Sequence, residues 1–554
     1  MIPTHLLFRK RAVSALLVIL CLHGFSIAGT ATARKAVSHS KSLAEQIKAI
    51  LESPELARAH WGIDVVEQPS GKVLYSLNSD QLFLPASNAK LFTTAAALAF
   101  AGPDYRFHTT VETTGKIDDK GRLQGDLVIV GRGDPNISGR VMPYQLKTER
   151  IAPHTQILED LAAQVAQKGL RIVDGDVVGD DTYYSPERYG QSWGQDDLQW
   201  IDGAPVSALT FNDNVIFLDI QPGQNPGDKA LVTQETDTNY YEFDNRIVTT
   251  AAGIVRKVGV HRDPGSKKVV LWGTIPIGDK GMKVALAIED PAEYTAQLFQ
   301  KILQQHGITV TGKARARHGD IAQFFDQVPA TPPVLPEIAN TVPSPATPSP
   351  APPAVATPSP SPSPTVVPSV LAEHISLPLI EDVRVTNKTS ENLHAELDLR
   401  LVGKLGGMTP SFEGGAAVVR QFLRQAGIND DEFVFLDGSG LSRRDLVTPD
   451  AVIKLLLYAS RQAWGAAYEQ TLPVSGVDGS LEDRFVNTPA GGLVHAKTGT
   501  LSHVSALSGY GETKSGGHFV FSILCNNHNL PTGRVLTAID RIVQALVRQE
   551  LPKQ

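Results

Sequence analysis

Cysteine is nearly absent from this chain, since its 554 residues include only Cys21 and Cys525. Cys21 lies in an N-terminal apolar run that we expect to be removed, which leaves no second thiol for an intramolecular disulfide. Zinc sites built from paired cysteines are excluded for the same reason. Cys525 ends the apolar run that starts at His518, and we interpret it as a buried strand thiol rather than a nucleophile.

An excess of positive charge is also lacking, because 51 Lys and Arg residues stand against 58 Asp and Glu residues, for a net charge of -7. Proteins that bind nucleic acid usually carry a basic surplus, so we expect no nucleic-acid partner. A His-Glu-x-x-His zinc motif is missing too. We therefore predict an activity that uses no metal and no other cofactor.

The N-terminus has the three parts of a secretory signal. Arg9–Arg11 form a positive segment, residues 12–29 are apolar, and Ala31–Ala33 fit a cleavage site of small residues. We predict a signal peptide over residues 1–33. The alternative is a retained membrane anchor, whose apolar run is borderline in length for a membrane span.

A chain of 554 residues is too long for one core, so two or three domains are expected. Residues 105–313 favour a β-rich inserted region with helices near 155–168 and 291–306. A return segment over 314–328 leads into 329–368, where Pro, Ser, Thr, Ala and Val dominate. This composition predicts disorder or polyproline structure, with a Pro-rich ligand for a partner as the alternative. Strands of the inserted region are expected at 125–131, 175–179, 214–220 and 268–272.

The flanking segments, 34–104 and 369–554, are predicted to form one α+β domain in which helices cover an antiparallel sheet. Alternating apolar residues on either side of a Pro-Ser-Gly turn predict a hairpin of 62–67 and 72–78. The other expected elements are helices over 42–59, 90–101, 387–405 and 533–548, an extended segment over 371–382, and strands over 493–498, 504–512 and 518–526.

Ser87 and Lys90 lie three residues apart at the predicted start of a helix, after the extended segment Leu82–Ala86. Residues at this spacing share a helix face, so the lysine amine can reach the serine hydroxyl and act as its base. A helix start also presents backbone N–H groups to a developing oxyanion. The base must be partly neutral, and we expect burial and a second cation, Lys497, to lower the pKa of Lys90.

Two further motifs follow in the last third of the chain. Ser390-Glu391-Asn392 lies about 300 residues after Ser87, and Lys497-Thr498-Gly499 lies about 105 residues after Asn392. Glycine on an edge strand lets a substrate backbone approach closely. Lys497 and Thr498 would then supply a cation and a hydroxyl to bind a carboxylate.

Each motif also has a purely structural interpretation. Ser-x-x-Lys is common by chance, and Ser38–Lys41 is another copy of it. Ser76–Asn78 likewise matches Ser-x-Asn, and Lys-Thr-Gly is also compatible with an exposed strand end that leads into a turn. The order of the three motifs and their spacing favour the catalytic interpretation.

The three motifs and their order resemble those of the penicillin-recognising serine enzymes. The segments Thr386–Thr389, Asp437–Ser442 and Pro473–Leu481 narrow the resemblance to the D-alanyl-D-alanine carboxypeptidase/endopeptidase family of penicillin-binding proteins (class C, penicillin-binding protein 4 type, peptidase family S13). It covers nearly the whole chain except the signal region and the Pro-rich tract. It implies a β-lactamase/transpeptidase-like domain split by a large insertion, which residues 105–313 fit.

The resemblance implies a serine D-alanyl-D-alanine carboxypeptidase and DD-endopeptidase that acts on peptidoglycan peptides in the periplasm. Ser87 would attack the D-Ala-D-Ala carbonyl to form an acyl-enzyme, and Lys90 would take its proton. Ser390 and Asn392 would relay protons and orient the substrate amide. β-Lactams would be covalent inhibitors of the same serine.

Substrate binding is implied by the same resemblance. Lys497, Thr498 and Thr500 would hold the terminal carboxylate, and the backbone N–H groups of Ser87 and Thr500 would form the oxyanion hole. Asp197, after Trp193, aligns with an acidic residue of the inserted domain that meets the amine of the peptide side chain; a solvated loop acid is the alternative.

One departure and two competing functions accompany the resemblance. The second motif reads Ser-Glu-Asn where Ser-Asp-Asn is frequent, but its middle residue, Glu391, is expected to point away from the reaction. A β-lactamase or esterase would use the same nucleophile, although no motif assigns the carboxylate that fast deacylation requires. A non-enzymatic scaffold that binds the cell wall is the other alternative, and the intact motifs argue against it.

Overall fold

The computed structural model describes residues 41–68, 70–145, 153–236, 238–326 and 367–553. Residues 43–554 form one compact unit, separate from residues 1–42. The predicted signal peptide and residues 329–366 of the Pro-rich tract lie outside the described residues. Within the described ranges, none of the helices combines the length and the apolar character that crossing a membrane requires.

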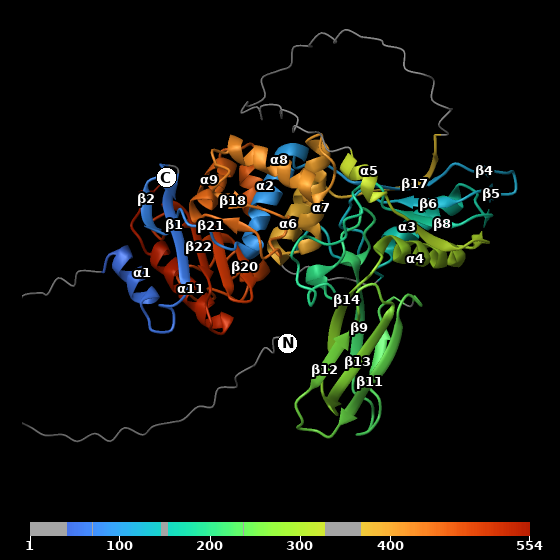
Figure 1. The fold of residues 1–554 in the computed structure, drawn as a ribbon, viewed down its shortest axis with the longest axis horizontal. Helices are drawn as coiled ribbons and strands as arrows, with labels where there is room; N and C mark the ends of the chain where they lie inside the picture. Colours follow the sequence, from blue (N-terminus) through green and yellow to red (C-terminus); the bar gives the residue numbers. More distant parts are fainter. Residues whose placement is uncertain (1–40, 69, 146–152, 237, 327–366, 554) are drawn as a thin grey trace, which may run out of the picture. The chain divides into compact units, whose positions relative to one another are not determined.

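A five-stranded antiparallel sheet unites the first and last segments of the described chain (Figure 1). β1 (His60–Gln68) pairs with β2 (Val73–Leu77), as the predicted hairpin, and on its other side with β22 (His518–Asn526). β21 (Val504–Glu512) pairs with β22, and β20 (Val494–Leu501) forms the edge beside β21. The antiparallel sheet predicted from the last three strands is thereby confirmed and enlarged.

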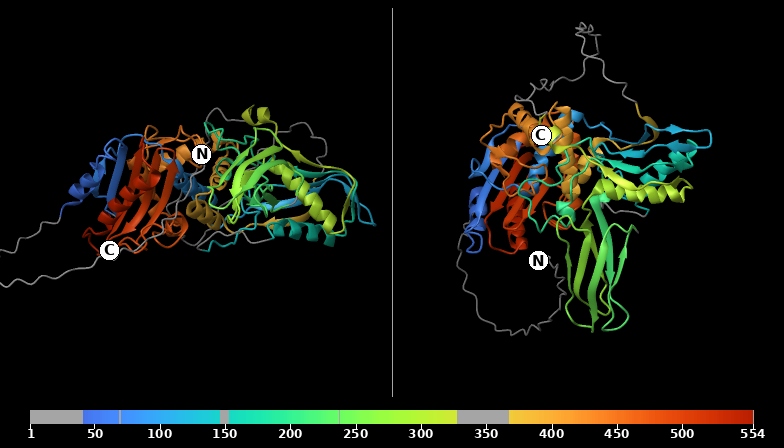
Figure 2. Two further views of the ribbon diagram at one scale, coloured as in Figure 1. Left: turned by 90° about the horizontal axis from the view of Figure 1, so that it is seen from below. Right: turned by 45° about the vertical axis from the view of Figure 1, so that its right-hand side comes forward.

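Helices cover both faces of this sheet, as Figures 1 and 2 show. Neighbouring strand residues point to opposite faces, so Val520 and Phe521 belong to different cores. One core also contains side chains of α1 (Leu43–Leu51) and α11 (Thr532–Val547). The other contains side chains of α2 (Ala89–Ala101), α6 (Leu379–Thr389), α7 (Asn392–Leu405), α8 (Phe412–Gln425) and α9 (Pro449–Ser460).

Cys525 lies in the first of these cores and has no exposed surface. Burial raises the pKa of its thiol to about 12, so the thiolate is not populated at neutral pH. The interpretation as a buried strand thiol is confirmed.

The inserted region has a core of its own. Its larger sheets have the orders β16-β8-β6-β3-β17 and β15-β7-β5-β4, with helices α3 (Gln156–Gln167) and α4 (Pro291–Gln305). The strands of these sheets are β3 (His108–Thr113), β4 (Lys116–Ile117), β5 (Arg122–Gln124), β6 (Leu127–Val130), β7 (Ile172–Val173), β8 (Val177–Asp180), β15 (Thr309–Val310), β16 (Ala314–Arg317) and β17 (Ser369–Ile375).

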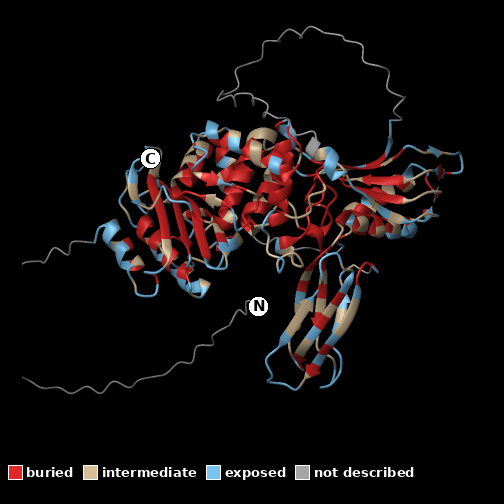
Figure 3. Cartoon of the chain, in the orientation of Figure 1, coloured by how far each residue is buried: buried red, intermediate tan, exposed pale blue. Residues whose placement is uncertain are grey.

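Two three-stranded sheets complete the inserted region, with the orders β10-β9-β14 and β11-β13-β12. Their strands expose more of their residues than those of the central sheet do (Figure 3). The strands are β9 (Val215–Gln221), β10 (Leu231–Gln234), β11 (Glu242–Thr250), β12 (Lys257–His261), β13 (Lys268–Pro276) and β14 (Met282–Ala287). Elsewhere in the described ranges, the short elements are α5 (Ile321–Asp326), α10 (Gly465–Thr471), β18 (Phe433–Val434), β19 (Leu446–Val447) and 3₁₀ turns at Ala86–Asn88, Ile201–Gly203, Asn212–Asn214 and Gly479–Leu481.

Three predicted helix boundaries are wrong. α1 ends at Leu51 and not near residue 59, because Pro54 cannot continue a helix. Residues 379–382 are the first turn of α6 rather than extended, and the acidic Glu381 and Asp382 there suit the helix dipole. The helix expected over 387–405 is two helices, because Ser390 between α6 and α7 is left-handed (φ 67°).

The strand pairing also differs from the boundaries expected for the inserted region. β16 pairs with β8, although residues 314–328 were expected to be a return segment. β17 pairs with β3, although residues from 369 onward were expected in the flanking domain. Both strands complete a sheet of the inserted region through partners far away in the sequence, which local patterns do not reveal.

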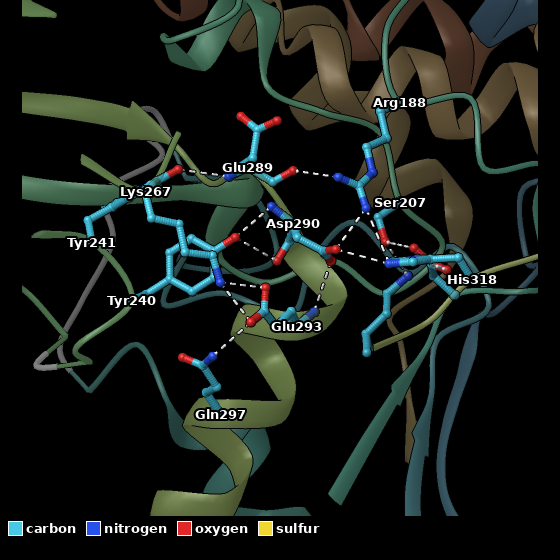
Figure 4. A network of polar contacts seen from close by, with 12 residues as sticks. Arg188, Ser207, Tyr240, Tyr241, Lys267, Glu289, Asp290, Glu293, Gln297 and His318 are labelled. Carbon is cyan, nitrogen blue, oxygen red and sulfur yellow. Dashed lines mark hydrogen bonds and ion pairs between the residues drawn. The ribbon is translucent and has the colours of Figure 1, made fainter. Parts of the chain in front are cut away.

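A network of charged side chains surrounds the start of α4 (Figure 4). Asp290 caps this helix by accepting a hydrogen bond from the Glu293 backbone at 3.0 Å, and Pro291 follows as its first residue. Arg188 and the His318 ring also contact the Asp290 carboxylate, at 2.7 and 2.9 Å. The other ring nitrogen of His318 contacts Asp181 at 2.9 Å.

This network predicts a dependence of stability on pH. Hydrogen bonds with Asp181 and Asp290 raise the pKa of His318 to about 10. Its contribution is therefore complete below the unfolded value of about 6.5 and is lost as pH rises toward 10. His318→Gln should lower the free energy of unfolding by about 1 kcal/mol at pH 6, since the ring is partly exposed, and by less at pH 10. Denaturant titrations of both proteins across this range measure the difference; a gap that widens with pH contradicts the assignment.

Candidate active site

Ser87 and Lys90 are brought together at the start of α2. Ser87 lies in the 3₁₀ turn Ala86–Asn88, and Lys90 lies in the first turn of the α-helix that follows. Lys90 Nζ donates a hydrogen bond to Ser87 Oγ at 3.0 Å. The amine therefore reaches the hydroxyl, as the spacing predicted, at a distance that permits proton transfer.

Lys90 is fully buried and makes two further hydrogen bonds. Its Nζ donates to Asn392 Oδ1 at 2.6 Å and to the Ser439 carbonyl at 2.7 Å. Burial lowers the pKa of Lys90 to about 8, although the charges of Asp437, Glu396, Asp202 and Glu391 oppose this shift. A substantial fraction of the amine is therefore neutral near pH 8 and able to accept a proton.

The second motif lies where α6 meets α7. Lys497 Nζ donates to Ser390 Oγ at 2.8 Å, and Asn392 Nδ2 donates to the Asp202 carbonyl at 2.8 Å. The left-handed backbone of Ser390 turns the chain between the two helices. Ser390 and Asn392 are thus joined to Lys497 and Lys90 respectively, so the structure unites all three motifs.

The third motif lies on β20, at the edge of the central sheet. Lys497 is fully buried, Thr498 is partly exposed and Thr500 is exposed. Asn88 Nδ2 donates to the Lys497 carbonyl at 3.0 Å and ties β20 to the start of α2. A Cβ atom on Gly499 would lie 2.8 Å from the Pro85 carbonyl, so this position requires glycine for close packing, and not only for the approach of substrate.

The electrostatic expectation for the two lysines concerns burial and their mutual repulsion. Burial is the largest cause of the lowered pKa of Lys90, as expected. Burial lowers the pKa of Lys497 well below its usual value, and the charge of Lys90 lowers it further. A substrate carboxylate that binds next to Lys497 would therefore serve as the counter-ion of this lysine.

Asp197 lies in the loop before the 3₁₀ turn Ile201–Gly203, whose Asp202 carbonyl contacts Asn392. Burial and the charges of Asp196 and Asp202 raise the pKa of Asp197. Within the described ranges, no hydrogen bond or ion pair joins Asp197 to the other predicted site residues. Its loop nevertheless follows Trp193, whose indole donates to Asp437 at 2.9 Å.

Several groups of the site were missed by sequence reasoning. The Ser439 carbonyl and the Asp202 carbonyl are backbone atoms, which carry no residue signature. Glu396 is fully buried and accepts hydrogen bonds from the Gly438 and Ser439 backbones at 3.0 and 2.9 Å, so it fixes the loop that holds Lys90. Glu396 lies four residues after Asn392 on the same helix, and this spacing of one helical turn was the signal in the sequence that could have placed it near the site.

The other copies of the motifs have different environments. Residues 38–40 of the second Ser-x-x-Lys lie outside the described residues. Asn78 donates to the Trp61 carbonyl at 2.8 Å, and Ser76 contacts Ser79, so the Ser76–Asn78 copy serves the hairpin. Within the described residues, no group of three or more His, Cys, Asp or Glu side chains is arranged to hold a metal ion.

The chain matches known proteins over most of its length. The model of the D-Ala-D-Ala carboxypeptidase 3 (S13) family matches residues 43–322 and 361–548. A D-alanyl-D-alanine carboxypeptidase of Actinomadura sp. (strain R39) is 33% identical over 531 residues, which are 94% of this chain and 87% of that protein. D-alanyl-D-alanine carboxypeptidase DacB of Haemophilus influenzae is 24% identical, over 83% of each chain.

Solved structures show the same fold. The crystal structure of penicillin binding protein 4 (dacB) from Haemophilus influenzae superposes with a TM-score of 0.72, at 21% identity, over 91% of this chain and 99% of that one. The complex of the same protein with a β-lactam superposes with a TM-score of 0.67 at 20% identity, over 91% of this chain and 100% of that one. The predicted α+β transpeptidase-like fold with its large insertion is confirmed.

Proposed function

This chain belongs to the D-Ala-D-Ala carboxypeptidase 3 (S13) family, and on that basis we propose a role for each residue of its site. It is a serine-type D-alanyl-D-alanine carboxypeptidase. The observation that carries the proposal is the buried Lys90, which contacts Ser87 Oγ, Asn392 Oδ1 and the Ser439 carbonyl at once. An amine held in this way is oriented toward a single serine.

Acylation begins when Ser87 Oγ attacks the carbonyl carbon of the penultimate D-alanine and transfers its proton to Lys90 Nζ. The resulting oxyanion is stabilised by the backbone N–H groups of Ser87 and Thr500. Collapse breaks the C–N bond, and the proton that Lys90 took from Ser87 passes through Ser390 Oγ to the departing D-alanine nitrogen. The neutral Lys90 then accepts a proton from the water that attacks the ester. As the ester bond breaks, Lys90 returns this proton to Ser87 Oγ, and the shortened peptide leaves.

The substrate carboxylate is bound by the third motif. Thr498 and Thr500 lie on the edge strand, where their hydroxyls can reach a ligand, and Lys497 supplies the positive charge. Ser480 Oγ lies 2.7 Å from Thr498 Oγ1 and fixes the hydroxyl of that residue. A free C-terminal carboxylate next to the scissile bond is thus the feature that the site selects.

We propose that the same acyl-enzyme chemistry also cleaves cross-linked peptides and reacts with β-lactams. A cross-linked stem peptide offers a D-alanyl bond with a free carboxylate nearby, so DD-endopeptidase cleavage of peptidoglycan follows the same steps. β-Lactams present a strained amide to Ser87 and would remain attached as esters; the related Haemophilus influenzae protein has been crystallised with a β-lactam. Access to peptidoglycan requires export, for which residues 1–33 are the proposed signal.

Incubation of the purified enzyme with cross-linked and uncross-linked muropeptides, followed by mass spectrometry, tests the proposed function. Carboxypeptidase action removes one D-alanine from pentapeptides, and endopeptidase action converts dimers to monomers. Recovery of both muropeptides unchanged would refute the proposed function. Rapid catalytic turnover of penicillin, without lasting labelling, would instead indicate a β-lactamase.

We propose further that Asp197 binds the amine at the end of the substrate's third side chain. The carboxyl is half-buried, and a substrate ammonium would replace part of the hydration that burial removes. Asp197→Asn should raise KM for a lysine-type peptide about tenfold and leave acylation by penicillin unchanged. Steady-state kinetics with amine-bearing and N-acetylated peptides measure this. Equal effects on both peptides would identify Asp197 as a solvated loop acid.

A further inference from the structure

Glu391, the middle residue of the second motif, contacts a side chain of the inserted region. Its Oε1 atom accepts a hydrogen bond from Arg140 Nη2 at 3.1 Å. The Arg140 side chain is only 3% exposed and the Glu391 side chain 13% exposed. A guanidinium from the inserted region is therefore buried against the residue that separates Ser390 from Asn392.

Arg140 has a second carboxylate partner in Asp213, which has no exposed side-chain surface. Asp213 lies between Asn212 and Asn214, and all three have positive φ angles of 52–55°. Left-handed backbone is unfavourable for residues other than glycine, so three in succession persist only where surrounding contacts hold them. This strained turn presents Asp213 to Arg140.

The network returns from Asp213 to the helices that flank the motif. His394 on α7 contacts Asp213 through Nε2 at 3.3 Å and Asp382 on α6 through Nδ1 at 2.7 Å. Asn136, which precedes Arg140 in the inserted region, donates to the same Asp382 at 2.8 Å. The two helices that end and begin at the motif are thus fixed to the same group of inserted side chains.

We propose that Arg140 is a positioning residue for the catalytic motif Ser390-Glu391-Asn392, so that the inserted region holds the reacting groups in place. This inference rests on the proposed function of the site. Arg140 does not touch the substrate; it acts through Glu391 on the two neighbouring residues. Asn392 is also held by the inserted region, through the Asp202 carbonyl.

The backbone conformation of the motif explains why its position has to be fixed. Ser390 has a left-handed conformation, and relaxation there would move its hydroxyl away from Lys497 and the Asn392 side chain away from Lys90. A displacement of 1 Å in a catalytic group can reduce a rate by about 100-fold. Arginine suits the position because one guanidinium can bind two carboxylates in fixed directions, whereas a lysine ammonium is a point charge.

Acylation of the full-length protein by a fluorescent penicillin measures the effect, with the acylation rate constant separated from initial binding by varying the penicillin concentration. We expect Arg140→Met to reduce the acylation rate constant by 30- to 100-fold with little change in initial binding. Arg140→Lys should recover at least a fifth of the wild-type rate. Glu391→Gln, which leaves the Arg140–Asp213 pair in place, should fold normally and acylate about tenfold more slowly.

Arg188→Met is the matched control, because Arg188 also pairs with a carboxylate in the inserted region, Asp290 at 2.7 Å, but lies in the network around α4. It should lower the melting temperature without changing the acylation rate constant of the folded protein. Wild-type acylation rates in Glu391→Gln, or in folded Arg140→Met, would overturn the inference while the proposed function stands. If wild-type protein itself is not labelled, the proposed function fails instead.

Discussion

Replacement of Ser87 by alanine is expected to abolish covalent labelling by penicillin and to reduce D-alanine release by about four orders of magnitude or more. In the proposed mechanism the acyl-enzyme needs an oxygen nucleophile at this position, and the neighbouring Lys90 amine acts as its base. The fold should tolerate the change, because Lys90 keeps its hydrogen bonds to Asn392 and Ser439.

Intact-protein mass spectrometry after exposure to a β-lactam measures the first effect, and release of D-alanine from a pentapeptide measures the second. Ser76→Ala is a suitable control, because Ser76 belongs to the other Ser-x-Asn copy and contacts Ser79 on the hairpin. It should retain full labelling. Persistent labelling of Ser87→Ala would mean that another nucleophile forms the acyl-enzyme.

Replacement of Lys90 by methionine is expected to slow acylation by about 10²–10⁴-fold, which is the usual contribution of a positioned general base. Methionine approximates the length of the lysine side chain but cannot accept a proton. Burial already disfavours the lysine charge, so the loss of this charge should not unfold the protein. The Asn392 side chain and the Ser439 carbonyl lose a donor, which adds a positional component to the rate loss.

The wild-type enzyme supplies an independent test through its pH profile. Burial lowers the pKa of Lys90 to about 8, and only the neutral amine accepts the Ser87 proton. The acylation rate constant should therefore rise with pH up to about 8 and level off above it. In Lys90→Met this rise should disappear. A wild-type rate that is independent of pH between 6 and 9 would exclude Lys90 as the base.

The contact between Ser87 and Lys90 was accessible from the sequence because it depends on local spacing. Two residues three positions apart share a helix face, and the Lys90 amine does reach the Ser87 hydroxyl. The central sheet was accessible for a similar reason, since its last three strands are consecutive and apolar. The early end of α1 could also have been predicted from Pro54.

Other features depend on contacts between distant segments. The break at Ser390 is not marked by a glycine or a proline. The pairing of β17 with β3 joins the first strand of the inserted region to a strand that follows the Pro-rich tract. No sequence motif contains Arg140. Its proposed positioning role follows only from its ion pairs with Asp213 and Glu391 in the folded protein.

The pairing of β1 with β22 has a consequence for how the protein folds. Asn88 contacts a carbonyl 409 residues away, and Leu84 donates to the Asn526 side chain across 442 residues. Contacts of such high sequence separation close large loops and form slowly. On a ribosome, β22, the strand at the centre of the sheet, is synthesised only after β1 and the whole inserted region. Asn88 and Lys497 therefore meet only after the inserted region has been made, so catalytic activity should arise late in folding, together with closure of the sheet.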